Sequence, residues 1–145
     1  MTSSFKNKNR GYQQLRVWND AIEFFTEICR VFRALPYELK RLSSQNIASA
    51  DSVHRNIAEG YCRRSIGEYI QFLYYALGSL GESVSGLIAC RKAQLLSEPD
   101  FTSLNALAFK TENELLKLVE SLERKHRAGD WIDHLAPAEP NASEL

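Results

Sequence analysis

Residues 66–95 contain the pattern that most constrains the fold of this chain. Apolar side chains recur at alternating intervals of four and three residues over three heptads, at Ile66, Ile70, Leu73, Leu77, Leu80, Val84 and Leu87. A second stripe beside it has the same spacing and changes from aromatic to small residues: Tyr69, Phe72, Ala76, Ser79, Ser83, Gly86 and Cys90. This periodicity predicts one helix of about 45 Å, at ~1.5 Å rise per residue, with two packed faces.

Three further segments show helical periodicity. Residues 15–35 carry two neighbouring stripes, the first being Val17, Ala21, Phe24, Ile28, Val31 and Leu35, and the second Trp18, Ile22, Phe25, Cys29 and Phe32. Residues 97–128 carry Phe101, Leu104, Ala108, Thr111, Leu115, Leu118 and Leu122. Residues 37–59 form the least apolar segment, because Ser43, Asn46, Ser49 and Asp51 interrupt its stripe. We favour a partly exposed helix there over a polar face that lines a cavity or meets a partner.

Short signals mark where these helices begin and end. Pro36 separates the first two helices, and Gly60 is expected to be a left-handed residue past the end of the second. Ser65 and Glu68 have the spacing of a capping box at the start of the long helix. Ser97 and Pro99 suit the start of the last helix, and Gly129 its end.

Four long helices with short connections predict an all-α fold, an up-down-up-down antiparallel four-helix bundle. We assign residues 1–14 to a flexible basic N-terminus, 15–128 to the bundle and 129–145 to a disordered tail. The stripes on the first and third helices exceed what one bundle buries. Gly78, Gly81 and Gly86 also suggest a close backbone approach. We therefore expect a homo-oligomer that closes into a ring.

Composition excludes several classes of protein. No apolar run approaches the roughly 20 residues of a membrane span, and the N-terminus has no signal-peptide core. The 3 cysteines are widely separated, which argues against a disulfide framework and favours a cytoplasmic location.

The charge is zero overall but is unevenly distributed. Residues 1–64 contain 11 basic and 6 acidic residues, a net +5, whereas residues 65–145 contain 7 and 12, a net −5. Such asymmetry fits either a basic surface for a polyanion or charge pairing between helices and subunits. We favour charge pairing, because a strongly positive domain is the usual sign of nucleic-acid binding.

Several short motifs together resemble a known family. They are Leu15-Arg-Val-Trp18, Leu35-Pro36-Tyr-Glu38, Gln45, Asn56-Ile-Ala-Glu-Gly60 with Arg64, Ser65 and Glu68, and Ala76-Leu-Gly78-Ser79-Leu80 with Glu82. The pattern resembles the four-helix-bundle proteins encoded by intervening sequences in bacterial 23S ribosomal RNA genes, a family similar to the accessory variability protein of diversity-generating retroelements. It covers roughly residues 12–126. The resemblance implies a cytoplasmic homopentamer that associates with RNA, DNA or a nucleic-acid enzyme.

One segment departs from that family. The family usually carries two arginines shortly after the position of Gln45, where this chain has Asn46-Ile47-Ala48-Ser49-Ala50. If those arginines contact phosphates, nucleic-acid affinity is lower here.

The sequence contains no catalytic or metal-binding motif. The histidines His54, His126 and His134 lack ligand spacing, and no phosphate-binding loop or nucleophile elbow occurs. We expect Asn56, Glu59 and Arg64 to form a buried polar network between two helices rather than a catalytic site. Cys62, beside Arg63 and Arg64, is expected to be an unreactive thiol. We therefore expect a non-enzymatic protein with no cofactor, metal, membrane or small-molecule substrate.

Two functional hypotheses remain. The first is a ring-shaped oligomeric adaptor for nucleic acid or a nucleic-acid enzyme, whose candidate contacts are Lys6, Lys8, Arg10, Arg16, Arg63, Arg64, Arg91 and Lys92. The second is a structural protein-interaction oligomer with no nucleic-acid role. The family resemblance favours the first, whereas the zero net charge and the missing arginine pair favour the second.

Overall fold

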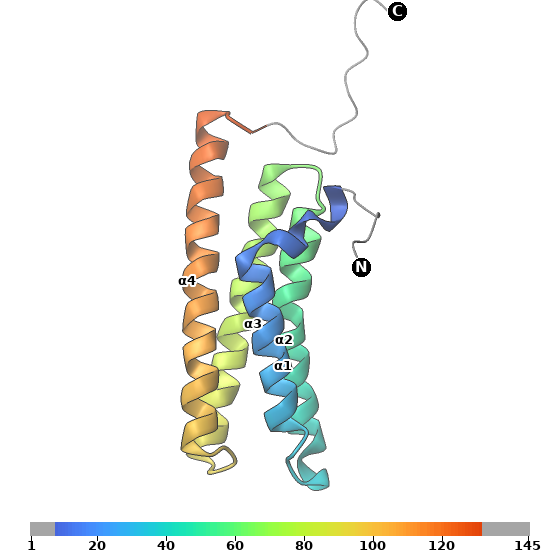
Figure 1. Cartoon of the computed structure of the whole chain (residues 1–145), viewed down its shortest axis with the longest axis vertical. Coiled ribbons are helices and arrows are strands. Elements are labelled where there is room, and N and C mark those ends of the chain that lie inside the picture. The colour runs from blue at the N-terminus through green and yellow to red at the C-terminus, as the bar shows by residue number, and fades with distance from the viewer. Residues whose placement is uncertain (1–7, 132–145) are drawn as a thin grey trace, which may run out of the picture.

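The computed structural model describes residues 8–131, which form six helical elements and no strand. A 3-10 helix η1 (Lys8–Gln14) precedes α1 (Arg16–Phe32), and a short η2 (Tyr37–Leu39) leads into α2 (Lys40–Tyr61). The long α3 (Ile66–Lys92) and α4 (Glu98–Ala128) complete the chain. The chain is therefore all-helical, and its four long helices fit a bundle (Figure 1).

The connections between the helices lie at two ends of the molecule. The α2–α3 turn, η1 and the last turn of α4 lie together at one end, which we call the turn end (Figure 1). The α1–α2 and α3–α4 connections lie at the opposite end. Residues 8–14, assigned from the sequence to a flexible segment, form η1, which packs against α1 and α2. Lys6 and the tail from residue 132 lie outside the described residues.

The core follows the apolar stripes expected from the sequence. Leu73, Ala76, Leu80 and Leu87 of α3 are completely buried, and so are Phe24 of α1 and Leu115 of α4. The second stripe of α1 is used inside the bundle, because Phe32 is buried and Trp18 and Phe25 pack against the core. The surplus apolar surface expected on α1 is therefore largely covered by the chain itself.

Helix α2 is partly exposed, as expected, but its polar stripe is buried against α3 instead of facing solvent. Ser43, Asn46 and Ser49 are each less than a tenth exposed. Ser83 of α3 donates to Ser49 Oγ at 3.0 Å, and Ser79 donates to Ser52 Oγ at 2.8 Å. These bonds satisfy side chains that would otherwise destabilise the interface, and they fix the register of the two helices.

The glycines act differently from one another. A side chain at Gly60 would meet the Phe72 Cβ at 2.8 Å, and one at Gly86 would collide with the Asn46 amide. Gly78 and Gly81 instead face open space and are exposed. The expected close backbone approach is therefore absent at these two positions within the described chain.

One carboxyl pair lies in the α1–α4 interface. Asp20 is 7% exposed and accepts a hydrogen bond from Lys110 Nζ at 3.4 Å. Asp20 Oδ2 and Glu114 Oε2 are buried and have no donor among residues 8–131. A proton on Glu114 turns one of these acceptors into a donor. Burial, and then the hydrogen bond and charge of Asp20, raise the pKa of Glu114 to about 7, although Lys110 and Arg16 oppose the rise.

A candidate nucleic-acid interface at the turn end

The α2–α3 turn places two arginines at the end of the bundle. Gly60 lies inside α2, so the expectation of a left-handed residue there is wrong. The C-cap is Cys62, with φ −82°, and the only left-handed glycine among residues 8–131 is Gly129. Gly60 is small because α3 packs closely against it. The helix therefore continues to Tyr61, and the turn spans residues 62–65.

Ser65 caps α3, as the sequence predicts. Its Oγ accepts the Glu68 N–H at 3.2 Å and donates to the Glu68 carboxylate at 3.3 Å. The first turn of α3 is thus occupied by a carboxylate of the chain itself. Its negative charge disfavours a second anion at the amides of this helix end, so cationic side chains are the better candidates for holding an anion here.

The two neighbouring arginines have different surroundings. Arg63 forms an ion pair with Glu59 at 2.7 Å, and its guanidinium lies 4.6 Å from the centre of the Phe72 ring. Arg64 is exposed and makes no hydrogen bond or ion pair with any residue in the range 8–131. Arg64 is therefore the member of the pair whose charge is available to a ligand.

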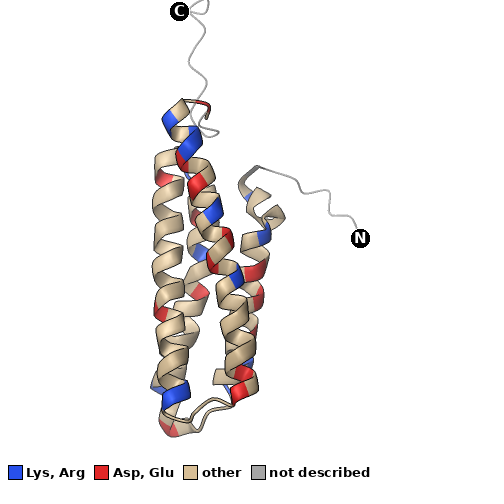
Figure 2. Cartoon of the chain, turned by 90° about the vertical axis from the view of Figure 1, so that its left-hand side faces the viewer, with Lys and Arg blue, Asp and Glu red and all other residues tan. Residues whose placement is uncertain are grey.

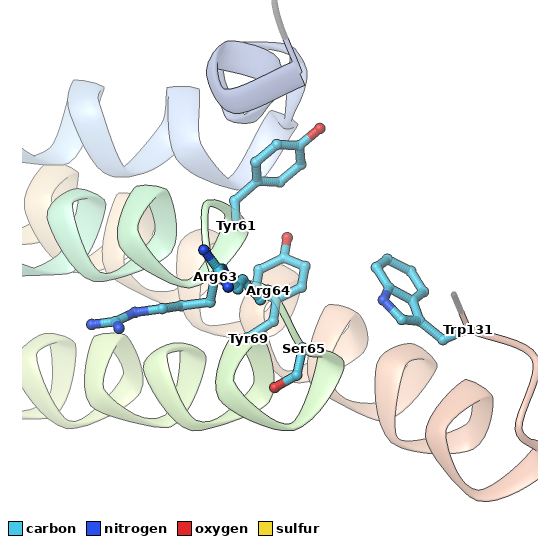
Figure 3. A pocket seen from close by; sticks show the side chains of 6 residues that line it. All are labelled: Tyr61, Arg63, Arg64, Ser65, Tyr69 and Trp131. Carbon is cyan, nitrogen blue, oxygen red and sulfur yellow. The ribbon is translucent and has the colours of Figure 1, made fainter. Parts of the chain in front are cut away.

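A cavity of about 140 Å³ opens beside this turn, lined by Tyr61, Arg63, Arg64, Ser65, Tyr69 and Trp131. Figure 3 shows Tyr61 and Tyr69 on one side of the opening and Trp131 across from them. Tyr69 is 6% exposed, and its hydroxyl has no hydrogen-bond partner in the described part of the chain. Burial raises the pKa of Tyr69, so this hydroxyl remains a donor at neutral pH.

Aromatic rings connect the cavity to the rest of the turn end. The ring centres of Trp18 and Tyr12 are 5.3 Å apart, those of Tyr12 and Tyr61 are 6.2 Å apart, and those of Tyr61 and Tyr69 are 5.9 Å apart. A side chain at position 11 would collide with the Tyr61 hydroxyl, which explains Gly11. These contacts hold η1 and α2 in fixed positions beside the cavity.

The last turn of α4 adds positive charge. Lys125 and Arg127 lie there, and Lys125 Nζ is 5.8 Å from the centre of the Trp131 ring. Asp130 follows as an acidic neighbour. Here the cations lie beside rings that are partly exposed (Tyr61 and Trp131), and cations beside aromatic rings on which bases can stack are the combination with which proteins hold single-stranded nucleic acid.

The structure brings together only some of the predicted contacts. Arg63 and Arg64 lie at the turn end, and Lys8 and Arg10 belong to η1 at the same end. Arg16 begins α1, where its charge acts on Glu114. Arg91 and Lys92 end α3 at the opposite end of the molecule. Arg91 is bound there by Glu98 at 2.9 Å and covers Phe101.

The expected polar network of Asn56, Glu59 and Arg64 does not form. Asn56 donates to the backbone oxygen and the hydroxyl of Ser52 on its own helix, and Glu59 pairs with Arg63. The link between α2 and α3 is made by serines instead. Glu82 lines a separate groove with Asn46 and Gly86. Ile47 and Ala48 stand where the resemblance predicts two arginines, and Ile47 is half-buried whereas Ala48 is exposed, so these positions present no charge to a ligand.

Metal binding, thiol chemistry and membrane insertion were each compared with the described residues. Within residues 8–131 no group of three or more His, Cys, Asp or Glu side chains is arranged to hold a metal ion. Burial raises the pKa of the Cys62 thiol, which makes it less nucleophilic at neutral pH. His54 Nε2 and Asp51 Oδ1 form a hydrogen bond of 2.8 Å, and the His54 ring packs against Trp18 and Phe25. No helix in the described range is both long and apolar enough to span a membrane.

A second feature is an exposed apolar face on α3 and α4. Tyr74 Oη donates to Glu123 at 2.7 Å, and Arg91 binds Glu98, so the two helices run in opposite directions. Gly81 of α3 and Leu116 of α4 lie about two turns, or seven residues, along the helices from the pair of Tyr74 and Glu123. Ile88 and Phe109 lie two turns further along the same faces. Ile88, Phe109 and Leu116 are between 42% and 58% exposed. Few charges interrupt α3 between its ends (Figure 2).

Comparison with known proteins agrees with this fold. The sequence model of the family described as 23S rRNA-intervening sequence protein matches residues 13–129. A solved structure from Bacteroides thetaiotaomicron, a protein of unknown function from the S23 ribosomal protein family, is similar with a TM-score of 0.68. The two are 23% identical over 72% of this chain and 95% of the other. No curated protein matches the sequence.

Proposed function

Because the chain belongs to the family of 23S rRNA-intervening sequence proteins, we propose that it is a non-enzymatic, homo-oligomeric adaptor that binds single-stranded nucleic acid, free or held by a nucleic-acid enzyme. The observation that carries the proposal is the unpaired Arg64 beside an aromatic cavity. Its location is expected to be cytoplasmic, since the 3 cysteines are unpaired.

Assembly is the second part of the proposal. We expect the helices to keep an up-down-up-down order and five copies to close into a ring. The apolar face of α3 and α4 supports self-association, because exposed contiguous apolar surface marks interaction sites. In a ring each copy would repeat the turn end, so a neutral chain would present several clustered cationic sites.

The binding proposal is tested with fluorescently labelled single-stranded RNA and DNA in a salt titration. We expect weak binding, in the range of ~10⁻⁴–10⁻⁶ M, that does not depend on the overall sequence and weakens as salt increases. Arg64→Gln should reduce both the affinity and the salt dependence. Lys92→Gln is the matched control, because it removes one exposed cation from the opposite end.

The alternative is a protein-interaction oligomer with no nucleic-acid role. The exposed apolar face and the zero net charge favour it. Absence of binding at ~50 mM salt, where electrostatic contacts are strong, would leave this alternative standing. Equal losses in Arg64→Gln and Lys92→Gln would show that binding is not located at the turn end.

A further inference from the structure

The cavity beside the α2–α3 turn has a size and lining that specify a ligand. Its volume of about 140 Å³ is close to the ~150 Å³ of a protein cavity that admits benzene. A six-membered ring therefore fits inside, whereas part of the fused rings of a purine would have to remain outside the opening. The rings of Tyr61, Tyr69 and Trp131 provide flat apolar walls on which a base can stack.

One polar group in the cavity lacks a partner. The Tyr69 side chain is more than nine-tenths buried, yet its hydroxyl bonds to no residue in the range 8–131. This hydroxyl lines the cavity and can therefore donate to an acceptor atom of a ligand. Every pyrimidine base carries a ring carbonyl oxygen next to its glycosidic nitrogen, which supplies such an acceptor.

The rim of the cavity provides charge for a phosphate. Arg64 has no protein partner, and Lys125 lies above the Trp131 ring. Arg63 is held by Glu59 and Phe72, and the Glu68 carboxylate occupies the first turn of α3. The cations available to a phosphate are therefore Arg64 and Lys125.

From these observations we infer that the cavity binds the base of a pyrimidine nucleotide, with Tyr69 donating to the base carbonyl and Arg64 and Lys125 facing the phosphate. The inference deepens the proposed function, on which it rests, by giving the turn end a preferred unit within a single strand. The same chemistry is shared by a free mononucleotide and by a strand of RNA or DNA.

Tryptophan fluorescence of the full chain tests the inference. The chain has 2 tryptophans, so Trp18→Phe leaves Trp131 as the sole reporter. Uridine and cytidine monophosphates should quench this signal, whereas adenosine monophosphate and ribose 5-phosphate should do so much more weakly. If Trp18→Phe alters helix content, the unmodified chain with Trp131→Phe as blank gives the same difference signal.

Two variants locate the contacts. Tyr69→Phe removes only the hydroxyl, and it should weaken uridine monophosphate binding by about three- to tenfold without lowering thermal stability. Arg64→Gln should weaken the monophosphate but leave binding of the uncharged nucleoside unchanged. An unchanged affinity in Tyr69→Phe, or equal quenching by adenosine monophosphate, would overturn the inference.

Strand binding separates this inference from the proposed function. Oligouridine that binds without changing Trp131 fluorescence would overturn the cavity as a base site and leave the adaptor in place. Pyrimidine mononucleotides that quench Trp131 while no oligonucleotide binds would support the cavity and remove the proposed function. Quenching by both, with a preference for oligouridine over oligoadenosine, is the result that we expect.

Discussion

Arg63 and Arg64 show how adjacent residues of one type acquire different roles. Arg63 follows Glu59 by four residues and pairs with it from the turn just past α2, so the sequence spacing was enough to suggest this pair. Arg64 lies beyond the helix, where no local rule supplies a partner. The contribution of Trp131 depends on where α4 ends relative to α3. That tertiary relation explains why sequence reasoning located the basic pair but missed the aromatic cavity.

Capping at Ser65 is a local effect that the sequence predicted. Ser65→Ala should lower the free energy of unfolding by about 1 kcal/mol, because the Glu68 amide loses its acceptor. Urea denaturation measures the change. Ser97→Ala is the matched control, since Ser97 caps α4 in the same way through Asp100. A loss at Ser97 with none at Ser65 would contradict the cap at the α2–α3 turn.

Glu114 should make stability depend on pH. Its pKa is raised from 4.5 to about 7 in the folded chain, so the folded state holds a proton that the unfolded state has released. Stability should therefore fall as the pH rises from about 4.5 to about 7. Glu114→Gln keeps a donor for Asp20 and should flatten this dependence, as measured by thermal denaturation across that range. A profile identical to that of the parent would contradict the role of Glu114.

The helices illustrate what periodicity can and cannot predict. The buried faces of α3 and α4 were predicted correctly, because the residues that repeat at intervals of three and four lie on one side of a helix and pack into the core. The polar side of α2 was misjudged, because serines paired across an interface look like solvent-exposed serines in a sequence. Gly60 was assigned to a left-handed turn for a similar reason, since close packing and a positive φ both favour glycine.

Packing between α2 and α3 gives Gly60 a testable role. Gly60→Ala should lower the free energy of unfolding by about 1–2 kcal/mol, because its Cβ would lie 2.8 Å from the Phe72 Cβ. Gly67→Ala is the control, since a Cβ there has no neighbour nearer than 3.9 Å and alanine favours a helix by up to about 1 kcal/mol. Chemical denaturation of both variants should give shifts of opposite sign. A stabilising Gly60→Ala would show that the two helices are not closely packed there.

For the whole molecule, the exposed face of α3 and α4 is the feature with the largest consequence. The sequence indicated surplus apolar surface on α1 and α3, and the structure covers most of that on α1. Gly78 and Gly81 face outward between Tyr74 and Ile88, and no residue in the range 8–131 lies close to them, so these glycines leave room for the approach of another subunit. Subunit number depends on the angle at which two such faces meet, which no spacing in one chain encodes.

Self-association should be visible in solution. At micromolar concentration we expect one species with five times the 16.5 kDa mass of a single chain, measured by light scattering. Gly81→Arg should dissociate it, because a long cationic side chain would replace open space at the centre of the face. Lys117→Arg, which retains the charge of an exposed position on α4, is the control. A monomeric parent protein would contradict assembly through this face.

The location of residues 8 and 131 at the same end as the α2–α3 turn has a practical consequence. A fluorescent label, affinity handle or surface linkage near either position would stand beside the cavity and compete with whatever enters it. The α3–α4 connection lies a bundle length away (Figure 1). A reporter attached at residue 93 or 94 would therefore leave the cavity accessible, and the chain could be immobilised with its turn end facing the solution.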